Sequence, residues 1–465
     1  MKSIIRNIFK KRLDFVLIFL LITFSFIIRT YLLDKIPTNL TGDESWDLSN
    51  IYRISFGTDT YPLTLLGDGS VPAILFYPVA LAINFFGTSL SIIFLRLNIV
   101  MYSLFALIGF YLILEKSTSK LIAFLFTILL SSNYVFLNFS RTAWVNMAAV
   151  FSGLFLIFYI EKAIKNKKDL YYLLAGIFAG ISFYSYHYGR VLVCFIIAYL
   201  IIKLLKNFFR KDLIRGFMIF FTTLIVVIIP FLTTSADKSI FRRPEATFAF
   251  SQSKITGKIT TIPTVFLSQL KYTLKGFLLL DETVMGRGIE NQRYVPLGIS
   301  PVNNIIKFLF WGGLIYFVVK RKYLIWWMII LSVLITQILS DLPPNFSRGL
   351  FYIPAIYFIS GVFTYKALIY IINLFKLNIH RNFIYLCLLG FTIFAAIKDI
   401  DLYFTWMNTP NMYNMRQPAI SYEEFPYWQN YQINIIKYGG YPIVNQQWYV
   451  IRDNVINNNE INYDN

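Results

Sequence analysis

Long apolar segments dominate this sequence and limit what it can fold into. Of the 465 residues, 57% are hydrophobic and 14% are charged, whereas a globular domain has about 25% charged residues. A helix needs about 20 apolar residues to cross the hydrocarbon core of a bilayer. We therefore predict an all-α polytopic membrane protein with about eleven transmembrane helices. The windows lie near residues 13–33, 91–114, 119–138, 143–162, 170–188, 191–207, 213–234, 301–319, 323–340, 350–374 and 382–404.

Basic residues indicate how these helices are oriented. The N-terminal segment has five Lys and Arg residues before the first window and no small-residue cleavage site after it, so we expect an uncleaved anchor with a cytoplasmic N-terminus. The stretch Val71–Phe86 is apolar but is interrupted by Pro72 and Pro78. If it does not cross the membrane, the later basic clusters all join the N-terminus in the cytoplasm, as the positive-inside rule requires. We therefore predict that Val71–Phe86 is a helix lying in the outer interface.

This orientation divides the chain into regions. We predict a transmembrane domain at 1–404, with outer loops at 34–89 and 235–300, and an extracytoplasmic tail or small cap at 405–465. Loops of this length are usually functional. The net charge of +19 is explained by cytoplasmic loops, so we expect no nucleic-acid partner. Cys194 and Cys387 each lie in an apolar run, which indicates packing and no disulfide framework.

Three arginines break the positive-inside rule because they lie at the outer ends of predicted spans. They are Arg141, Arg190 and Arg348. One interpretation of each is that it reaches toward outer lipid headgroups. Three on one side favour a shared anion, and the planar guanidinium suits phosphate. His187, three residues before Arg190, is either a second phosphate donor or a packed polar residue.

Two further arginines and two carboxylates lie near the outer boundary. Arg29 and Arg96 fit headgroup contact better than ligand binding. Asp43 and Glu44 follow Gly42 in the first outer loop. Adjacent carboxylates point in different directions, so one would accept a proton while the other orients it or binds a hydroxyl; the alternative is that both are solvated.

Metal binding has little support in the sequence. There are two histidines, and the predicted orientation puts His380 on the cytoplasmic side, away from the carboxylates. No ligand spacing indicates a site, although a carboxylate-bound divalent cation stays open. We expect that no metal or other cofactor is required.

Several motifs follow one another in a distinctive order. An anchor helix and a Gly-Asp-Glu loop precede a Pro-containing interfacial helix. This order resembles the GT-C membrane glycosyltransferases, and within them the bacterial relatives of protein O-mannosyltransferases and of the lipid A aminoarabinose transferase. The similarity spans roughly residues 1–360 and includes Gly42-Asp43-Glu44, Phe86-Gly87-Thr88-Ser89, Arg96-Leu97, Phe139-Ser140-Arg141-Thr142-Ala143, Gly180-Ile181-Ser182-Phe183-Tyr184-Ser185-Tyr186, Arg190 and Asp341-Leu342-Pro343-Pro344-Asn345-Phe346-Ser347-Arg348.

The resemblance implies a glycosyltransferase of the cytoplasmic membrane whose active site faces outside. It would move a hexose or pentose, with inversion, from a polyprenyl-phosphate donor to a hydroxyl of a protein, lipid or cell-envelope glycan. Asp43 would accept the proton of the attacking hydroxyl, and Glu44 would position acceptor or sugar. Arg141, Arg190, Arg348 and His187 would bind the donor phosphate, with possible support from Arg96, Tyr186 and Asn345.

The chain departs from this pattern at one position. Several relatives have a Lys before the proline of the interfacial helix, where it helps to hold the donor phosphate, but Gly69-Ser70-Val71-Pro72 has none. Either the arginines bind the phosphate alone, or Lys254 or Lys271 of the second outer loop reaches the site.

Two other classes of function stay open. A transporter or flippase of lipid-linked saccharides would also collect outer arginines, but transporters usually show inverted repeats and broken helices, whereas these spans read as continuous. A non-catalytic scaffold of envelope assembly would not depend on Asp43. The sequence does not specify the sugar, the acceptor, the polyprenyl lipid or the oligomeric state.

Overall fold

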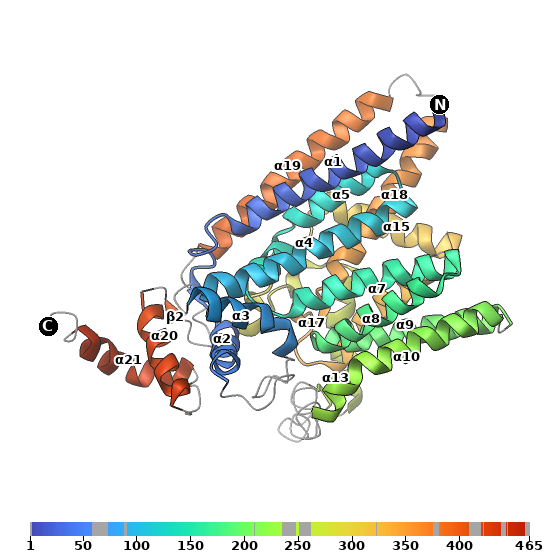
Figure 1. Cartoon of the computed structure of the whole chain (residues 1–465). Coiled ribbons are helices and arrows are strands. Elements are labelled where there is room, and N and C mark those ends of the chain that lie inside the picture. The colour runs from blue at the N-terminus through green and yellow to red at the C-terminus, as the bar shows by residue number, and fades with distance from the viewer. Residues whose placement is uncertain are drawn as a thin grey trace.

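Figure 1 shows the computed structural model of the chain, which is built almost entirely of helices. The structure describes residues 2–57, 73–87, 91–208, 210–234, 248–250, 262–321, 323–374, 381–408, 420–421, 423–438, 443 and 445–460.

Every apolar window predicted to cross the membrane contains a helix. Among the described residues, six helices are long and apolar enough to cross on their own, or seven if one bent pair counts as a single span. The polytopic all-α fold is therefore confirmed, while the total of eleven spans stays a prediction. The helices are α1 (Lys2–Thr30), α4 (Ser91–Ser117), α5 (Lys120–Ser132) with α6 (Tyr134–Arg141), α7 (Asn146–Asn166), α8 (Asp169–Tyr184), α9 (His187–Lys206), α10 (Lys211–Thr234), α15 (Asn304–Lys320), α16 (Leu324–Leu339), α18 (Tyr352–Leu374) and α19 (Arg381–Met407).

The window at 119–138 is broken, so the expectation that all spans are continuous is wrong there. Helices α5 and α6 meet at an angle of 64°. Asn133 lies between them with non-helical dihedral angles of φ −53° and ψ 124°, and its side chain accepts a hydrogen bond from the Phe136 N–H that starts α6. The Asn133 amide also donates to the Pro301 carbonyl at 2.7 Å. These side-chain bonds compensate for the backbone bonds that the break removes.

The first outer loop contains two helices, α2 (Gly42–Ser55) and α3 (Tyr77–Phe86), and the 3-10 turn η1 (Ala73–Phe76) between them. Gly42, Asp43 and Glu44 therefore begin a helix within the region predicted as the first outer loop. Helix α3 confirms the helical part of the prediction for 71–86, and it leaves Leu81 and Phe85 54% and 80% exposed. Its placement in the membrane interface stays a prediction.

The second outer loop and the segment between α16 and α18 are built of short elements. In chain order these are α13 (Ile262–Thr273), the π-helical turn η3 (Leu274–Leu278), the 3-10 turn η4 (Glu282–Val284), α14 (Ile289–Gln292) and α17 (Phe346–Gly349). Of these, α13 and α17 are labelled in the lower part of Figure 1, as α2 is.

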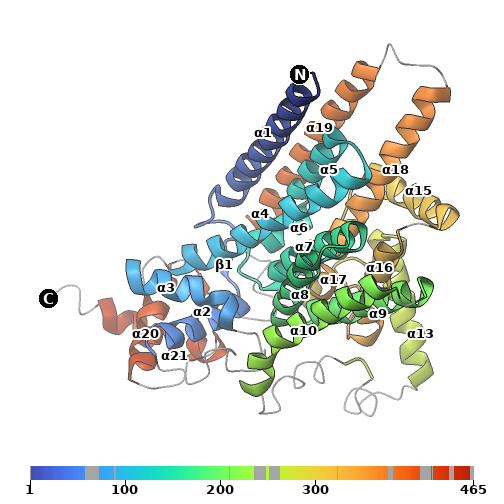
Figure 2. The same ribbon diagram turned by 45° about the vertical axis from the view of Figure 1, so that its right-hand side comes forward.

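The C-terminal region folds back onto the first outer loop. Strand β2 (Ile420–Ser421) pairs antiparallel with β1 (Asn39–Leu40). Helices α20 (Phe425–Lys437) and α21 (Asn445–Glu460) follow. In both Figure 1 and Figure 2 these helices lie beside α2 and α3, at the opposite end of the molecule from the N-terminus.

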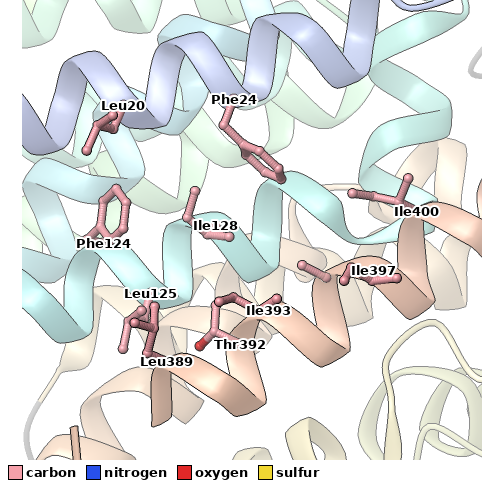
Figure 3. A pocket seen from close by; sticks show the side chains of 11 residues that line it. Leu20, Phe24, Phe124, Leu125, Ile128, Leu389, Thr392, Ile393, Ile397 and Ile400 are labelled. Atoms are coloured by element: carbon pink, nitrogen blue, oxygen red, sulfur yellow. The ribbon is translucent and has the colours of Figure 1, made fainter. Parts of the chain in front are cut away.

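An apolar cavity of about 360 Å³ lies between α1, α5 and α19 (Figure 3). The residues lining it belong to the middle of three predicted spans, and none of them is a predicted site residue. The lining consists of Leu20, Phe24, Phe124, Leu125, Ile128, Leu389, Thr392, Ile393, Ala396, Ile397 and Ile400.

Candidate active site

Glu44 is fixed by protein groups on both of its carboxylate oxygens. Thr41 and Glu44 form a capping box at the start of α2, in which Glu44 Oε2 accepts the Thr41 N–H at 3.0 Å. Glu44 Oε1 accepts from Arg96 Nε and from the Ala143 N–H, each at 3.0 Å. Both charged side chains are 0% exposed. This geometry does not fit the expected contact of Glu44 with sugar or acceptor, and instead makes Glu44 the anchor of α2.

Arg29 and Arg96 do not reach toward lipid headgroups, so that prediction is wrong. Both are 0% exposed. Besides Glu44, Arg96 donates to the carbonyls of Leu33 and Asn39. Arg29 donates to Ser103 Oγ at 2.9 Å and to the side chain and carbonyl of Ser131, among others. Each arginine ties helices together inside the protein.

Arg141 is also fully buried, and all five of its N–H donors are used. The guanidinium donates to the carbonyls of four residues at the end of α1 and just after it, and to the Tyr403 hydroxyl. A guanidinium has five N–H donors and no acceptor. Arg141 therefore has no donor left for a phosphate, and its predicted role does not fit the structure. The four carbonyls are those of Ile28, Arg29, Tyr31 and Ile36.

Asp43 keeps an accessible carboxylate and is paired with an arginine that the sequence did not single out. Its Oδ2 lies 3.2 Å from Nη1 of Arg293, and the side chains of Asp43 and Arg293 are 34% and 20% exposed. Asp43 belongs to the first turn of α2, where the helix dipole favours a negative charge. Arg293 comes from the second outer loop, just after α14. That loop has many cations, so an unusual outer charge could not distinguish Arg293 from the others.

Aromatic rings hold Arg293 in place. Its guanidinium lies 4.9 Å from the centre of the Tyr294 ring and 6.0 Å from that of Trp144. Tyr294 stacks on Phe139 at 5.4 Å and meets Trp144 edge-on at 5.2 Å. Burial raises the pKa of the Tyr294 hydroxyl, and the nearby charge of Asp43 raises it further. Tyr294 is therefore a neutral wall of the site at physiological pH.

Helix α17 brings Arg348 to the same region. Asn345 caps this helix, and its Oδ1 accepts from the Ser347 N–H at 3.0 Å and the Arg348 N–H at 3.3 Å. The Arg348 guanidinium pairs with Asp341 and is 15% exposed. The Tyr186 hydroxyl lies 3.3 Å from Ser347 Oγ. Asn345 thus orients Arg348 through its Oδ1.

Electrostatic contacts link these groups into one site. The charges of Asp43 and Arg293 both act on Tyr294, and Tyr186 lies close enough to act on Arg293, Tyr294 and Arg348. The site therefore unites α2, the junction between α8 and α9, the segment after α14, and α17.

Arg190 and His187 both belong to α9, which begins at His187, whereas the predicted windows separated them. Arg190 Nε donates to the Phe183 carbonyl at 3.2 Å, and its guanidinium lies 5.6 Å and 5.2 Å from the rings of Phe183 and Phe231. The His187 ring lies 5.2 Å from that of Tyr186. His187 thus adjoins Tyr186, whereas Arg190 contacts Phe183 and Phe231.

Two further predictions concern cations and metals. Lys271 lies on α13 with its amine 6.0 Å from the ring of Tyr272, and Lys254 lies outside the described residues. Among the residues that the structure describes, no three His, Cys, Asp or Glu side chains come together as metal ligands do.

Comparisons with known proteins agree with this fold. Residues 70–234 match the family described as dolichyl-phosphate-mannose-protein mannosyltransferase. No curated protein matches the chain in sequence. The apo oligosaccharyltransferase of Archaeoglobus fulgidus aligns with a TM-score of 0.52 and 13% identity, over 94% of this chain and 60% of that chain. Its form tethered to an acceptor peptide with the NVT sequon gives 0.50 and 14%, over 90% and 57%.

A second solved protein aligns more loosely. ArnT from Cupriavidus metallidurans, bound to undecaprenyl phosphate, gives a TM-score of 0.46 and 10% identity, over 90% of this chain and 77% of that chain. The present chain spans about 60% of the length of the archaeal oligosaccharyltransferase. The resemblance drawn from the sequence motifs is confirmed at the level of the fold: this polytopic membrane protein has the GT-C fold of membrane glycosyltransferases.

Proposed function

We propose that the protein transfers a sugar from a polyprenyl-phosphate donor to an acceptor hydroxyl, with inversion, at the outer face of the cytoplasmic membrane. The Asp43–Arg293 pair supports this proposal most directly. Glu44, Arg96 and Arg141 are fully buried and bonded to protein, whereas Asp43 and Arg293 are both partly exposed and lie 3.2 Å apart. A base and a cation at that separation suit a reaction in which a hydroxyl loses a proton and a phosphate departs.

The reaction is a single displacement. Asp43 accepts the proton of the acceptor hydroxyl as its oxygen bonds to the anomeric carbon, on the face opposite the phosphate. The bond between that carbon and the phosphate oxygen breaks, and the departing polyprenyl phosphate takes the electron pair. Arg293 and Arg348 stabilise its negative charge. A phosphate is a good leaving group, so the reaction needs no general acid.

The name of the matching family supports a polyprenyl-phosphate donor. Dolichyl phosphate is a polyprenyl phosphate, and the matched residues 70–234 include Tyr186 and His187. The matching family is described as acting on protein, so a protein hydroxyl heads the list of acceptors, followed by lipid and cell-envelope glycan. We leave the sugar open between hexose and pentose.

The test compares wild type with Asp43→Asn and Arg293→Ala, purified in detergent and given a panel of polyprenyl-phosphate sugars with envelope extract. The measurement is release of free polyprenyl phosphate. Asp43→Asn should lower the rate by about 10²–10⁴-fold with donor binding retained, because it removes a general base. Arg293→Ala should weaken donor binding and slow transfer.

Two control variants make the same changes of charge at an aspartate and an arginine elsewhere in the second outer loop. Asp281 is 26% exposed and paired with Lys275 at 3.4 Å, and Arg287 lies over the Tyr272 ring in the same outer loop. Asp281→Asn and Arg287→Ala should transfer at the wild-type rate. Release that is equal in Asp43→Asn and Asp281→Asn would contradict the assignment of the base.

A flippase is the second candidate, because the broken α5–α6 span is a feature of transporters. The break is filled, however: Asn133 and Tyr134 are 0% and 1% exposed and bonded to the carbonyls of Pro301 and Ser300. Proteoliposomes distinguish the two. Movement of a lipid-linked sugar across the bilayer without release of polyprenyl phosphate, unchanged in Asp43→Asn, would favour the flippase. Neither movement nor release by wild type would favour a scaffold.

A further inference from the structure

The C-terminal segment, which comprises the described residues 420–421, 423–438, 443 and 445–460, packs against the helix that carries Asp43. Strand β1 ends immediately before Thr41, the residue that caps α2. Its Leu40 lies opposite Ile420 of β2 in the antiparallel pair. These two side chains are 1% and 0% exposed. The stretch of chain that leads into Asp43 is therefore held by backbone pairing and by an apolar contact with the C-terminal segment.

A second contact holds the other half of α2. The Gln429 amide of α20 donates to the Tyr52 hydroxyl of α2 at 2.6 Å, and the two residues are 6% and 0% exposed. Trp428, next to Gln429, is 0% exposed. The C-terminal segment thus contacts α2 at both ends, just before its first turn and in its last turns.

The C-terminal segment is itself well tied together. The Gln432 side chain donates to the carbonyl of Ile443 and accepts from its N–H, at 2.8 and 3.2 Å. Arg452 of α21 pairs with Glu424, just before α20, at 3.3 Å. Trp448 is 0% exposed. These contacts hold α20 and α21 together, so that the segment can support α2.

We infer that the C-terminal segment is a positioning part of the active site, which fixes Asp43 relative to Arg293. The two partners of this ion pair come from different outer loops, so their distance depends on what holds α2. A displacement of about 1 Å in a reacting group can cost about 10²-fold in rate. The inference rests on the proposed function in that Asp43 is taken as the base.

The first experiment removes the contact between Gln429 and Tyr52. Gln429→Leu and Tyr52→Phe should each lower kcat about fivefold, the effect of one hydrogen bond, and leave the dissociation constant of the donor unchanged. The double variant should lose no more than either single variant. Gln429→Glu should restore most of the rate, because the Tyr52 hydroxyl can donate to the carboxylate. Lys437→Gln, which changes an exposed residue at the end of α20, is the control and should match wild type.

Hydrogen exchange gives a readout that does not depend on activity. The amides of residues 42–48 should exchange faster in Gln429→Leu than in wild type, and at the wild-type rate in Lys437→Gln. If exchange and kcat are both unchanged in Gln429→Leu, the inference is wrong. If wild type transfers no sugar, the proposed function fails, while the exchange experiment still tests the support of α2.

The second experiment asks whether the segment stays in place during turnover. Asn39 and Ser421 lie directly opposite each other, at a separation that suits a cross-strand disulfide. Asn39→Cys and Ser421→Cys are introduced together after Cys194→Ser and Cys387→Ser. The oxidised protein should keep the transfer rate of the reduced protein. Loss of transfer on oxidation, with recovery on reduction, would show that the segment must leave, as a lid does, and would overturn the inference.

Discussion

At the scale of single residues, the number of donors already in use separates arginines that look alike in the sequence. Arg141 and Arg348 both lie at the outer end of a span, yet Arg141 has five protein acceptors and Arg348 has one carboxylate partner and remains partly exposed. Sequence position indicates that such a cation is unusual. It does not indicate which acceptors the guanidinium meets, because those depend on distant segments such as the end of α1.

Because all five N–H donors of Arg141 are bonded to protein, we expect Arg141 to contribute to stability. Arg141→Lys should lower the free energy of unfolding by about 3 kcal/mol, because an ammonium with three donors at one point cannot replace a five-donor fork. Donor affinity should be unchanged in the protein that remains folded. Thermal unfolding in detergent measures the first and equilibrium donor binding the second, with Arg287→Lys as the exposed control. Weaker donor binding at unchanged stability would instead support the role of Arg141 in binding the donor phosphate.

The proposed chemistry also predicts independence from divalent cations. Arg293 and Arg348 supply the positive charge at the departing phosphate, so a chelator should leave the rate of polyprenyl-phosphate release unchanged. The assay is run with and without EDTA, and then with Mg²⁺ or Mn²⁺ restored. A loss of rate that the metal ion reverses would show that Asp43 or another outer carboxylate binds a cation during the reaction.

At the scale of elements, two helix caps have recognisable patterns in the sequence. A prediction based on the mean hydropathy of long windows does not detect them. Thr41-Gly42-Asp43-Glu44 has the spacing of a capping box, which marks the start of α2. Asn133 in the window 119–138 is a good helix cap and marks the break between α5 and α6. The apolar windows themselves were predicted well, since each contains a helix. Strand β2 could not be predicted, because two residues that pair with a distant strand have no local pattern.

The cap at Asn133 allows a direct test of the broken span. Asn133→Leu removes the bond to the Phe136 N–H and the bond to the Pro301 carbonyl. The free energy of unfolding should fall by about 2 kcal/mol, since one buried cap and one buried hydrogen bond are lost. Thermal unfolding in detergent measures the change. Asn303→Ala, which removes the cap of α15, provides the comparison, with an expected loss of about 1 kcal/mol. Equal stability of Asn133→Leu and wild type would mean that the break is maintained by packing alone.

At the scale of the whole molecule, charge along the sequence predicted which helix ends lie together. The element order puts basic clusters such as those around Lys120 and Lys206 at one end of the helices, and Asp43, Tyr186 and Arg348 at the other. Charge along the sequence does not predict which cation pairs with Asp43. Arg293 lies in a loop rich in cations. It is the contacts with the rings of Trp144 and Tyr294 that place Arg293, and not another cation of this loop, beside Asp43.

The pairing of β1 with β2 also has a consequence for the order of biosynthesis. Domains form from the N-terminus as the chain is made, so α1, β1 and α2 reach the membrane long before residues 420–421 do. With the support inferred above, the helix that carries Asp43 gains its support only after residues 420–421 have been made. A nascent protein would therefore have α1 to α19 inserted while the proposed base still lacks that support, and turnover of the proposed donor would begin only after β2 has paired with β1.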